Sequence, residues 1–270
     1  MYLSKSLSVG TVLITIMEPH IREAYATEEE LCSRVLANAF LPIWNHNWFQ
    51  GTCSPIAKLP YVYDVHTKQP ALSSKQEQRR KFYHALIRFV RLGGGSLNVM
   101  TLDQDIVAIV LWSAPYKHPS FYHIISSGFL RLALIDYGLR AFWKIQFIFE
   151  YNIAQIMKDA QVVVERCGYV QMLAVNPDHQ GHGYGAKLLS HMLCRHVEQS
   201  ADSPGVLLDC TTTKAEKMYA KQGFQVIGER AVDSDTDVDG ITIPRSHPDY
   251  QEKRNRAKPY HIQKVMLWKP

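Results

Sequence analysis

Hydrophobic positions along the chain follow two periods, which predicts a mixture of strands and helices. Short apolar runs bounded by turn residues are typical of buried strands, and apolar residues three or four positions apart are typical of helices that bury one face. The strand pattern occurs at residues 19–24, 96–102, 106–112, 169–175, 205–211, 224–228 and 261–268. The helical pattern occurs at residues 27–39, 75–92, 115–161, 188–197 and 213–222. We therefore predict an α/β fold.

The first predicted helix leads into an unusually aromatic segment. Thr27 precedes three glutamates, and we expect it to cap the helix. Residues 40–50 carry two tryptophans, two phenylalanines and His46. A helix end packed in the core is the favoured interpretation, and a wall of a substrate pocket is the alternative. Residues 51–74 hold three prolines and little periodicity, which predicts a loop or a partial lid.

Residues 115–161 form a long apolar stretch with a helical pattern. Charged residues interrupt it every few positions, so it is not expected to cross a bilayer. Its apolar face can be buried against the sheet, over a substrate pocket or on a membrane surface, and the first two are favoured. Trp112, at the end of the preceding strand, is either a core residue or faces the substrate.

Composition narrows the class of protein. A hydrophobic share of 46% is ordinary for a globular chain. The net charge of +5 is spread along the sequence except at 253–258, which suits an anionic cofactor but argues against a nucleic-acid surface. The five cysteines show neither a Cys-x-x-Cys pair nor metal-ligand spacing, so we expect reduced thiols, no metal site and a cytoplasmic protein. Cys194 and Cys210 are expected in the core.

We expect one domain over residues 18–270, with a helical insert at 115–161. Residues 1–17 are interpreted as an N-terminal extension or an added strand, because no small-residue cleavage site follows their apolar run and the run is too short to span a membrane. The polar stretches 231–239 and 246–258 are expected to be exposed loops.

A glycine-rich turn between a strand and a helix is the most informative stretch. The strand at 169–175 stops at Asn176-Pro177-Asp178, because proline lacks the amide that a strand ladder needs. Residues 180–185 (QGHGYG) follow, and then a helix begins, with an apolar face expected at Leu188, Leu189, Met192, Leu193 and Val197. Glycines let a backbone approach a phosphate closely, and the amides of a first helical turn attract anions. The order of the glycines matches neither the dinucleotide-binding fingerprint nor the Walker pattern.

This stretch resembles the acyl-coenzyme A motif of the GNAT N-acetyltransferase family, Gln/Arg-x-x-Gly-x-Gly/Ala after a strand that ends in Val-x-Pro. Gln180, Gly183 and Gly185 match the motif, and Val175 and Pro177 match upstream. The resemblance implies a single-domain α/β fold with a mixed central sheet flanked by helices, here with a long helical insert before the coenzyme-binding strand.

A second GNAT signature, Asn-x-x-Ala-x-x-x-Tyr-x-x-x-Gly-Phe, is similar to residues 212–224. Ala215, Tyr219, Gly223 and Phe224 match in register, and Thr212 stands where the family often has asparagine. The resemblance implies acetyl-CoA as the acyl donor and Tyr219 as the acid that protonates the leaving thiolate. The coenzyme-binding residues that it implies are Leu173, Ala174, Val175, Gln180, Gly181, His182, Gly183, Tyr184, Gly185, Ala186 and Thr212.

The implied reaction is direct transfer to an amine, in which a backbone amide of the 173–175 strand polarises the thioester carbonyl. We expect a small-molecule amine as the acceptor, no nucleic-acid partner and no stable membrane insertion. A protein acetyltransferase and a non-catalytic coenzyme-A-binding sensor are the alternatives. Glu165, His118 and His46 are available as a general base, and deprotonation through ordered water is equally open, so no base is assigned. The acyl chain length and the oligomeric state are also left open.

Overall fold

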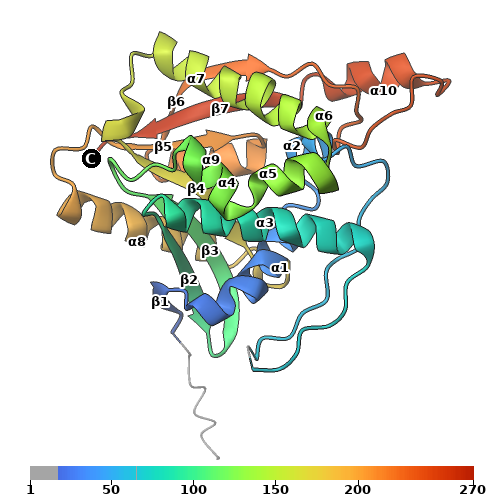
Figure 1. Ribbon diagram of the computed structural model, residues 1–270. Helices are drawn as coiled ribbons and strands as arrows, with labels where there is room; N and C mark the ends of the chain where they lie inside the picture. The colour runs from blue at the N-terminus through green and yellow to red at the C-terminus, as the bar shows by residue number, and fades with distance from the viewer. Residues whose placement is uncertain (1–17, 65) are drawn as a thin grey trace, which may run out of the picture.

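A single mixed sheet of seven strands runs through the molecule in the order β1-β2-β3-β4-β5-β7-β6 (Figure 1). The computed structural model describes residues 18–64 and 66–270, and the predicted extension over residues 1–17 lies outside them. The predicted strands are all present, with β6 continuing past Gly228. Their bounds are β1 His20–Glu23, β2 Ser96–Leu102, β3 Asp105–Ser113, β4 Gly168–Val175, β5 Val206–Cys210, β6 Gln225–Ala231 and β7 Ile262–Trp268.

Helices cover both faces of the sheet, as the predicted fold class requires. Helices α1, α3 and α7 bury their apolar sides in a core on one face, and α8 and α9 do so on the other. The helices are α1 Glu29–Ala39, α2 Trp44–Phe49, α3 Ser74–Leu92, α4 Phe121–Ser127, α5 Phe129–Arg131, α6 Leu139–Trp143, α7 Glu150–Asp159, α8 Tyr184–Gln199, α9 Thr213–Lys221 and α10 Tyr250–Ala257.

Thr27 does not cap α1, so that prediction was wrong. Thr27 lies in a single 3₁₀ turn, Ala26–Glu28, that precedes the helix. The buried carboxylate of Glu28 fixes the turn instead, because it accepts the Tyr25 N–H at 2.8 Å and pairs with Arg22 at 2.6 Å. A buried charge requires such partners, and their geometry sets the start of the helix.

The burial of α8 differs from the prediction at two positions. The buried side contains Leu188, Leu189 and Met192, and it continues with His196 rather than Val197, which is 46% exposed. Cys194 is exposed as well, whereas Cys210 is buried as expected. Both misplaced residues lie one or two positions off the helical repeat that the other apolar side chains define.

The two polar stretches are more ordered than expected. Ser234 and Thr236 are buried, and the Ser234 hydroxyl lies 2.7 Å from His261 Nδ1. Residues 250–257 form α10, which packs Ala257 inward. Polar composition therefore misled the prediction, because hydrogen bonds satisfy the buried hydroxyls.

The insert is helical, and its inner side packs on the protein. Leu132, Ala141, Phe149 and Ile153 are buried, α4 lies on α3, and α7 lies on β6 and β7. The π-helical turn Leu132–Asp136 connects α5 to α6, and the π-helical turn Lys144–Phe149 connects α6 to α7. This arrangement agrees with burial against the sheet.

The outer side of the insert carries an exposed apolar stripe. Leu139, Trp143, Phe147 and Tyr151 follow one another at four-residue spacing, and each is more than half exposed. The Trp143 and Phe147 rings stack with centroids 4.5 Å apart. No helix in the described part of the chain is long and apolar enough to cross a bilayer.

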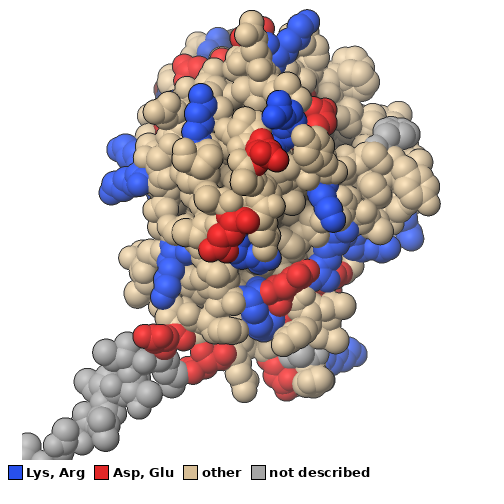
Figure 2. Space-filling view, turned by 90° about the vertical axis from the view of Figure 1, so that its left-hand side faces the viewer, with Lys and Arg blue, Asp and Glu red and all other residues tan. Residues whose placement is uncertain are grey.

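Basic and acidic side chains are interspersed on the face of the molecule shown in Figure 2. Lysine and arginine lie next to aspartate and glutamate there, with large uncharged areas between them. This mixed pattern fits the spread of charge along the sequence, and the absence of a nucleic-acid partner stays a prediction.

Strands β4 and β5 are joined only briefly. Their parallel pairing covers Gly168↔Val206, Tyr169↔Leu207 and Val170↔Leu208, and beyond these pairs no register joins them. A register shift between β3 and β4 leaves Gln171 without an opposite residue, which is the geometry of a β-bulge. The two strands therefore part at the bulge, while β5 continues beside β7.

The close contact of β5 with β7 at Gly205 generates a stability prediction. A Cβ on Gly205 would lie 2.0 Å from the Trp268 carbonyl oxygen, so Gly205→Ala must displace backbone. Such overpacking destabilises by about 1–3 kcal/mol, which lowers Tm by roughly 5 °C in a chain of this size. Thermal unfolding measures the shift. Gly138→Ala is the control, because Gly138 also has a positive φ but faces open space; an equal loss in both variants would contradict the explanation.

Candidate functional site

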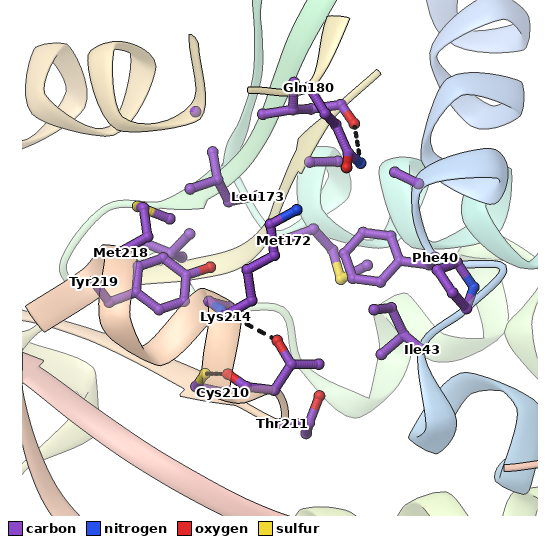
Figure 3. A pocket seen from close by; sticks show the side chains of 18 of the residues that line it. Phe40, Ile43, Met172, Leu173, Gln180, Cys210, Thr211, Lys214, Met218 and Tyr219 are labelled. Atoms are coloured by element: carbon purple, nitrogen blue, oxygen red, sulfur yellow. Dashed lines mark hydrogen bonds between the residues drawn. The ribbon is translucent and has the colours of Figure 1, made fainter. Parts of the chain in front are cut away.

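A cavity of about 410 Å³ occupies the place where β4 and β5 part (Figure 3). Its walls come from β4, the glycine-rich turn, the start of α8, the end of β5, α9 and the segment around α2. Every predicted site residue except His182 lines it. The lining residues of the glycine turn and the two strands are Val170, Gln171, Met172, Leu173, Ala174, Val175, Gln180, Gly181, Gly183, Tyr184, Gly185, Asp209 and Cys210.

The backbone of β4 presents free hydrogen-bonding groups to this cavity. The Asn176 N–H donates to the Val107 carbonyl at 2.9 Å, on the β3 side of the strand. Because successive residues of a strand direct their N–H groups to opposite edges, Leu173 and Val175 direct theirs into the gap and Ala174 faces β3. The Gln180 side chain donates to the Val175 carbonyl at 3.4 Å, on the gap side.

The glycine-rich turn closes one end of the cavity. Gly181 and Gly183 have φ values of +89° and +78°, which favour glycine, and Gly183 is the N-cap of α8. Gly185 lies in the first turn, where an added Cβ would be 2.9 Å from Val175 Cγ2. The first-turn amides of this 16-residue helix therefore face the cavity without side chains in the way, which is a site for an anion.

Two predicted coenzyme-binding residues have other roles in this structure. The His182 ring stacks on Tyr184 with centroids 5.6 Å apart and is not part of the cavity wall. The Thr212 hydroxyl lines the cavity, and it also caps α9 by accepting the Ala215 N–H at 3.3 Å. A side-chain contact from Thr212 to a ligand stays a prediction.

Tyr219 directs its hydroxyl toward the middle of the cavity (Figure 3). The residue is only 7% exposed, and its ring packs on Phe224 with centroids 5.8 Å apart. Burial raises the pKa of Tyr219, and the neighbouring Cys210 and Asp209 raise it further. The phenol therefore stays protonated at neutral pH, and its O–H is available as a hydrogen-bond donor.

The apolar wall opposite Tyr219 comes from the segment that joins α1 to α2. Phe40 and Ile43 face the cavity in Figure 3, and Asn45 and His46 also line it. Trp44 fixes this segment to the end of β5, because its indole N–H donates to the Thr211 carbonyl at 2.9 Å. The aromatic segment thus forms both a buried helix and a wall of the cavity. Both interpretations from the sequence, core packing and pocket wall, therefore apply to it.

The loop at 51–73 supports the glycine turn from outside. Lys58 pairs with Asp178 at 2.6 Å, and Tyr61 donates to the Asn176 side chain at 3.0 Å. No described residue of the loop lines the cavity. The loop therefore does not cover the cavity as a lid. It contacts the turn that follows β4 and stabilises it.

The sequence interpretation missed two acidic side chains on the α7 side of the sheet. The Tyr169 hydroxyl donates to Asp209 Oδ1 at 3.4 Å, and burial raises the pKa of Asp209 to about 6. Burial, followed by the charge of Asp209, raises the pKa of Glu150 to about 7. Asp209 is the only charged residue of β5, and a lone acid in an apolar strand is the signal that could have identified it.

The candidate bases suggested by the sequence lie in different places. His46 lines the cavity, but burial and then the charge of Arg79 lower its pKa, and its Nδ1 lies 2.8 Å from the Tyr83 hydroxyl. His118 contacts the Cys167 carbonyl at 3.1 Å, outside the cavity wall, and Glu165 is not part of that wall either.

The structure also shows the positions of two further residues. Trp112 is a core residue, 5% exposed and packed on His196. Lys214 of α9 was overlooked, and its side chain extends across the cavity in Figure 3.

Comparisons with known proteins agree with this geometry. Residues 143–226 match the model of the acetyltransferase (GNAT) domain family. A search of the curated proteins found no match. Among solved structures, arylalkylamine N-acetyltransferase 2 from Aedes aegypti is 14% identical, with 93% of this chain and 99% of that chain covered and a TM-score of 0.54. The Drosophila melanogaster polyamine N-acetyltransferase is 16% identical, with coverages of 94% and 100% and a TM-score of 0.51.

The fold, the glycine turn and the cavity between β4 and β5 define an acyltransferase of the GNAT type. The match over residues 143–226 identifies this part of the chain as a GNAT acetyltransferase domain. The two solved structures show the shared fold, since their identities to this chain are low.

The raised pKa of Glu150 generates a pH-dependent stability prediction. A carboxyl with a pKa of about 7 in the folded protein, against about 4.3 unfolded, stabilises the fold below the unfolded pKa, and this contribution is lost as pH rises toward 7. Glu150→Gln removes the loss, so its Tm should exceed the wild-type Tm by more at pH 8 than at pH 5. Thermal unfolding at both pH values measures the difference. A difference in Tm that grows toward low pH would contradict the raised pKa of Glu150.

Proposed function

We propose that the enzyme transfers the acetyl group of acetyl-CoA directly to the amine of a small molecule. One observation carries the proposal: the Tyr219 hydroxyl, the gap-facing amides of Leu173 and Val175, and the glycine turn line one cavity. The donor can place its pyrophosphate on the turn, its pantetheine arm along β4 and its thioester near Tyr219. Lys214 and the first-turn amides of α8 supply positive charge for the phosphates.

The chemistry follows from groups that are already in place. A β4 amide aimed into the gap polarises the thioester carbonyl, and it needs no reorganisation as negative charge develops on the oxygen. Tyr219 then protonates the sulfur as the carbon–sulfur bond breaks. No protein nucleophile is required, and burial raises the pKa of the Cys210 thiol to about 11, so this thiol in the cavity wall stays protonated.

A small acceptor is favoured by the shape of the apolar wall. Phe40, Ile43 and Met172 narrow the cavity, and the α1–α2 segment lies where an open peptide groove would have to pass. The two enzymes with the same fold act, by their names, on polyamines and on arylalkylamines. Both classes are small amines, which supports this choice of acceptor.

The domain boundaries and the location of the enzyme belong to the same proposal. Residues 18–270 act as one GNAT domain with the insert at 115–161, and residues 1–17 are an extension. All five cysteines are free thiols, which fits a cytoplasmic enzyme.

An acetyl-CoA turnover assay tests the proposal. The panel contains agmatine, spermidine, tryptamine, an arylamine, an aminoglycoside, free amino acids and a lysine-containing histone peptide. We expect turnover with at least one small amine and none with the peptide. Turnover with the peptide alone would favour a protein acetyltransferase, and coenzyme A binding without any turnover would favour a sensor.

The first prediction from this proposal concerns coenzyme affinity. Gly183→Val places a branched side chain at a φ of +78° where the backbone should meet the pyrophosphate, and Gly185→Val collides with Val175. Coenzyme A should bind at least about tenfold more weakly to each, a loss of roughly 1.4 kcal/mol by titration calorimetry. Gly138→Val is the matched control, because Gly138 has the same φ far from the cavity. Unchanged affinity in folded Gly183→Val would remove the phosphate site.

The second prediction concerns Tyr219. If its hydroxyl protonates the leaving sulfur, Tyr219→Phe should lower kcat by about 10²-fold or more while the Kd of coenzyme A stays nearly constant. If the ring serves only packing, the change should be almost silent, since the phenylalanine keeps the contact with Phe224. Pre-steady-state kinetics establish that chemistry limits the rate. Full turnover of a folded variant under that condition would exclude the acid role.

A further inference from the structure

We propose that Asp209 is the general base that removes a proton from the attacking amine, an assignment that rests on the proposed acetyl transfer. No sequence signature pointed to this residue. It is identified by its place in the gap, by its neighbours and by the absence of a competing cation beside it.

Asp209 stands at the point where the two strands part. Val170↔Leu208 is the last residue pair between β4 and β5, and Asp209 follows it, across the gap from the bulged Gln171. Leu208 and Cys210 belong to the core on the α8–α9 side, so the side chain of Asp209 lies on the other side, as its contact with Tyr169 confirms. It also lines the cavity.

Asp209 and Tyr219 therefore approach the reaction centre from opposite faces of the sheet. Tyr219 belongs to the core on the α8–α9 side, and it lies close enough to Asp209 for the carboxylate charge to raise its pKa. An amine that attacks from one face and a sulfur that leaves toward the other would each meet a proton-transfer group.

The surroundings of Asp209 leave its charge available to a substrate cation. Tyr169 of β4 donates a hydrogen bond, Glu150 of α7 adds negative charge, and His46 of α2 is held neutral by burial. Lys264 of β7 is occupied by Glu216 at 2.9 Å and Glu229 at 3.4 Å. Asp209 thus has no ion-pair partner in the described part of the chain, and a substrate ammonium can fill that role.

The proton affinity of Asp209 suits a base at neutral pH. Burial raises its pKa to about 6, so the group is mostly ionised at pH 7 yet far more basic than an exposed carboxylate. The charge of Asp209 in turn helps to raise the pKa of Glu150.

The proton transfers balance over one cycle. An acceptor R–NH₃⁺ gives one proton to the Asp209 carboxylate, and the neutral nitrogen forms a bond to the thioester carbon. The carbon–sulfur bond breaks, and Tyr219 gives its phenolic proton to the sulfur. The second nitrogen proton returns to the Tyr219 oxygen as the amide forms. Asp209 finally releases its proton to water, so the products are the acetylated amine, the free thiol and one proton.

The test is Asp209→Asn, which keeps the size of the side chain and removes its basicity. With each panel amine that the wild type acetylates, kcat/KM at pH 7 should fall by about 10²-fold, while the Kd of coenzyme A stays constant. The wild-type decline of kcat/KM below about pH 6 should disappear in the variant. Glu198→Gln, an exposed acid on α8 away from the cavity, is the control and should retain the wild-type profile.

Raising the pH separates a base from a structural residue. Raising the pH from 7 to about 9.5 increases the neutral fraction of an alkylamine with a pKa of about 10.4 by more than about 10²-fold, so less of the substrate needs a base. The ratio of wild-type to variant kcat/KM should therefore shrink at least about tenfold from its value at pH 7. Tyr219 stays protonated there, because its pKa is raised.

Each outcome decides the assignment. Full turnover of folded Asp209→Asn at pH 7, or a loss of equal size at both pH values, overturns the role of Asp209 and leaves the proposed acetyl transfer intact. If the wild type binds coenzyme A but acetylates no amine of the panel, the acetyl transfer itself fails, and the base fails with it. A ¹³C titration of the carboxyl groups gives an acceptor-independent check: a resonance that titrates near pH 6 should be lost in Asp209→Asn.

Discussion

The structure depends on one interruption of hydrogen bonding, the parting of β4 and β5 after three residue pairs. A sheet normally satisfies both edges of an inner strand, but from Gln171 onward β4 has a partner on the β3 side only. The amides of Leu173 and Val175 are left facing a cavity of about 410 Å³ instead of a neighbouring strand. A ligand with amide groups can take the place of that strand. The candidate binding site therefore consists of backbone groups on β4 that the sheet leaves unpaired.

The sheet also separates charges of opposite sign. On the α8 side, the glycine turn and the helix N-terminus favour an anion, and Lys214 adds positive charge across the cavity. On the α7 side, Asp209 and Glu150 favour a cation. Under the proposed function, the phosphates of the donor and the ammonium of the acceptor therefore occupy different faces and meet only at the gap. The apolar wall of Phe40 and Ile43 lowers the local dielectric, which strengthens both sets of interactions.

Local sequence was sufficient for the parts of the site that lie close together in the chain. The turn at 180–185 and Tyr219 were predictable because glycine conformation, helix start and residue spacing are all local properties. Asp209 and Glu150 were not, because 59 residues separate them and only the fold brings them together. The same limit explains the cavity wall around Phe40, which depends on a hydrogen bond from Trp44 to Thr211 across the molecule. Thr27 and Val197 were misplaced for a smaller reason, since a buried ion pair and a one-residue change of helical phase decide those positions.

The short pairing between β4 and β5 divides the sheet into two parts. Strands β1–β4 form one part of the sheet and β5–β7 form the other. Leu173 lies in the first part, and Tyr219 is attached to the second part through α9. The insert begins with α4, which packs on α3 beside the first part, and it ends with α7, which packs on β6 and β7 of the second part. The insert therefore connects the two parts of the sheet. Under the proposed function, the distance between the polarising β4 amide and Tyr219 therefore depends on helices that do not line the cavity.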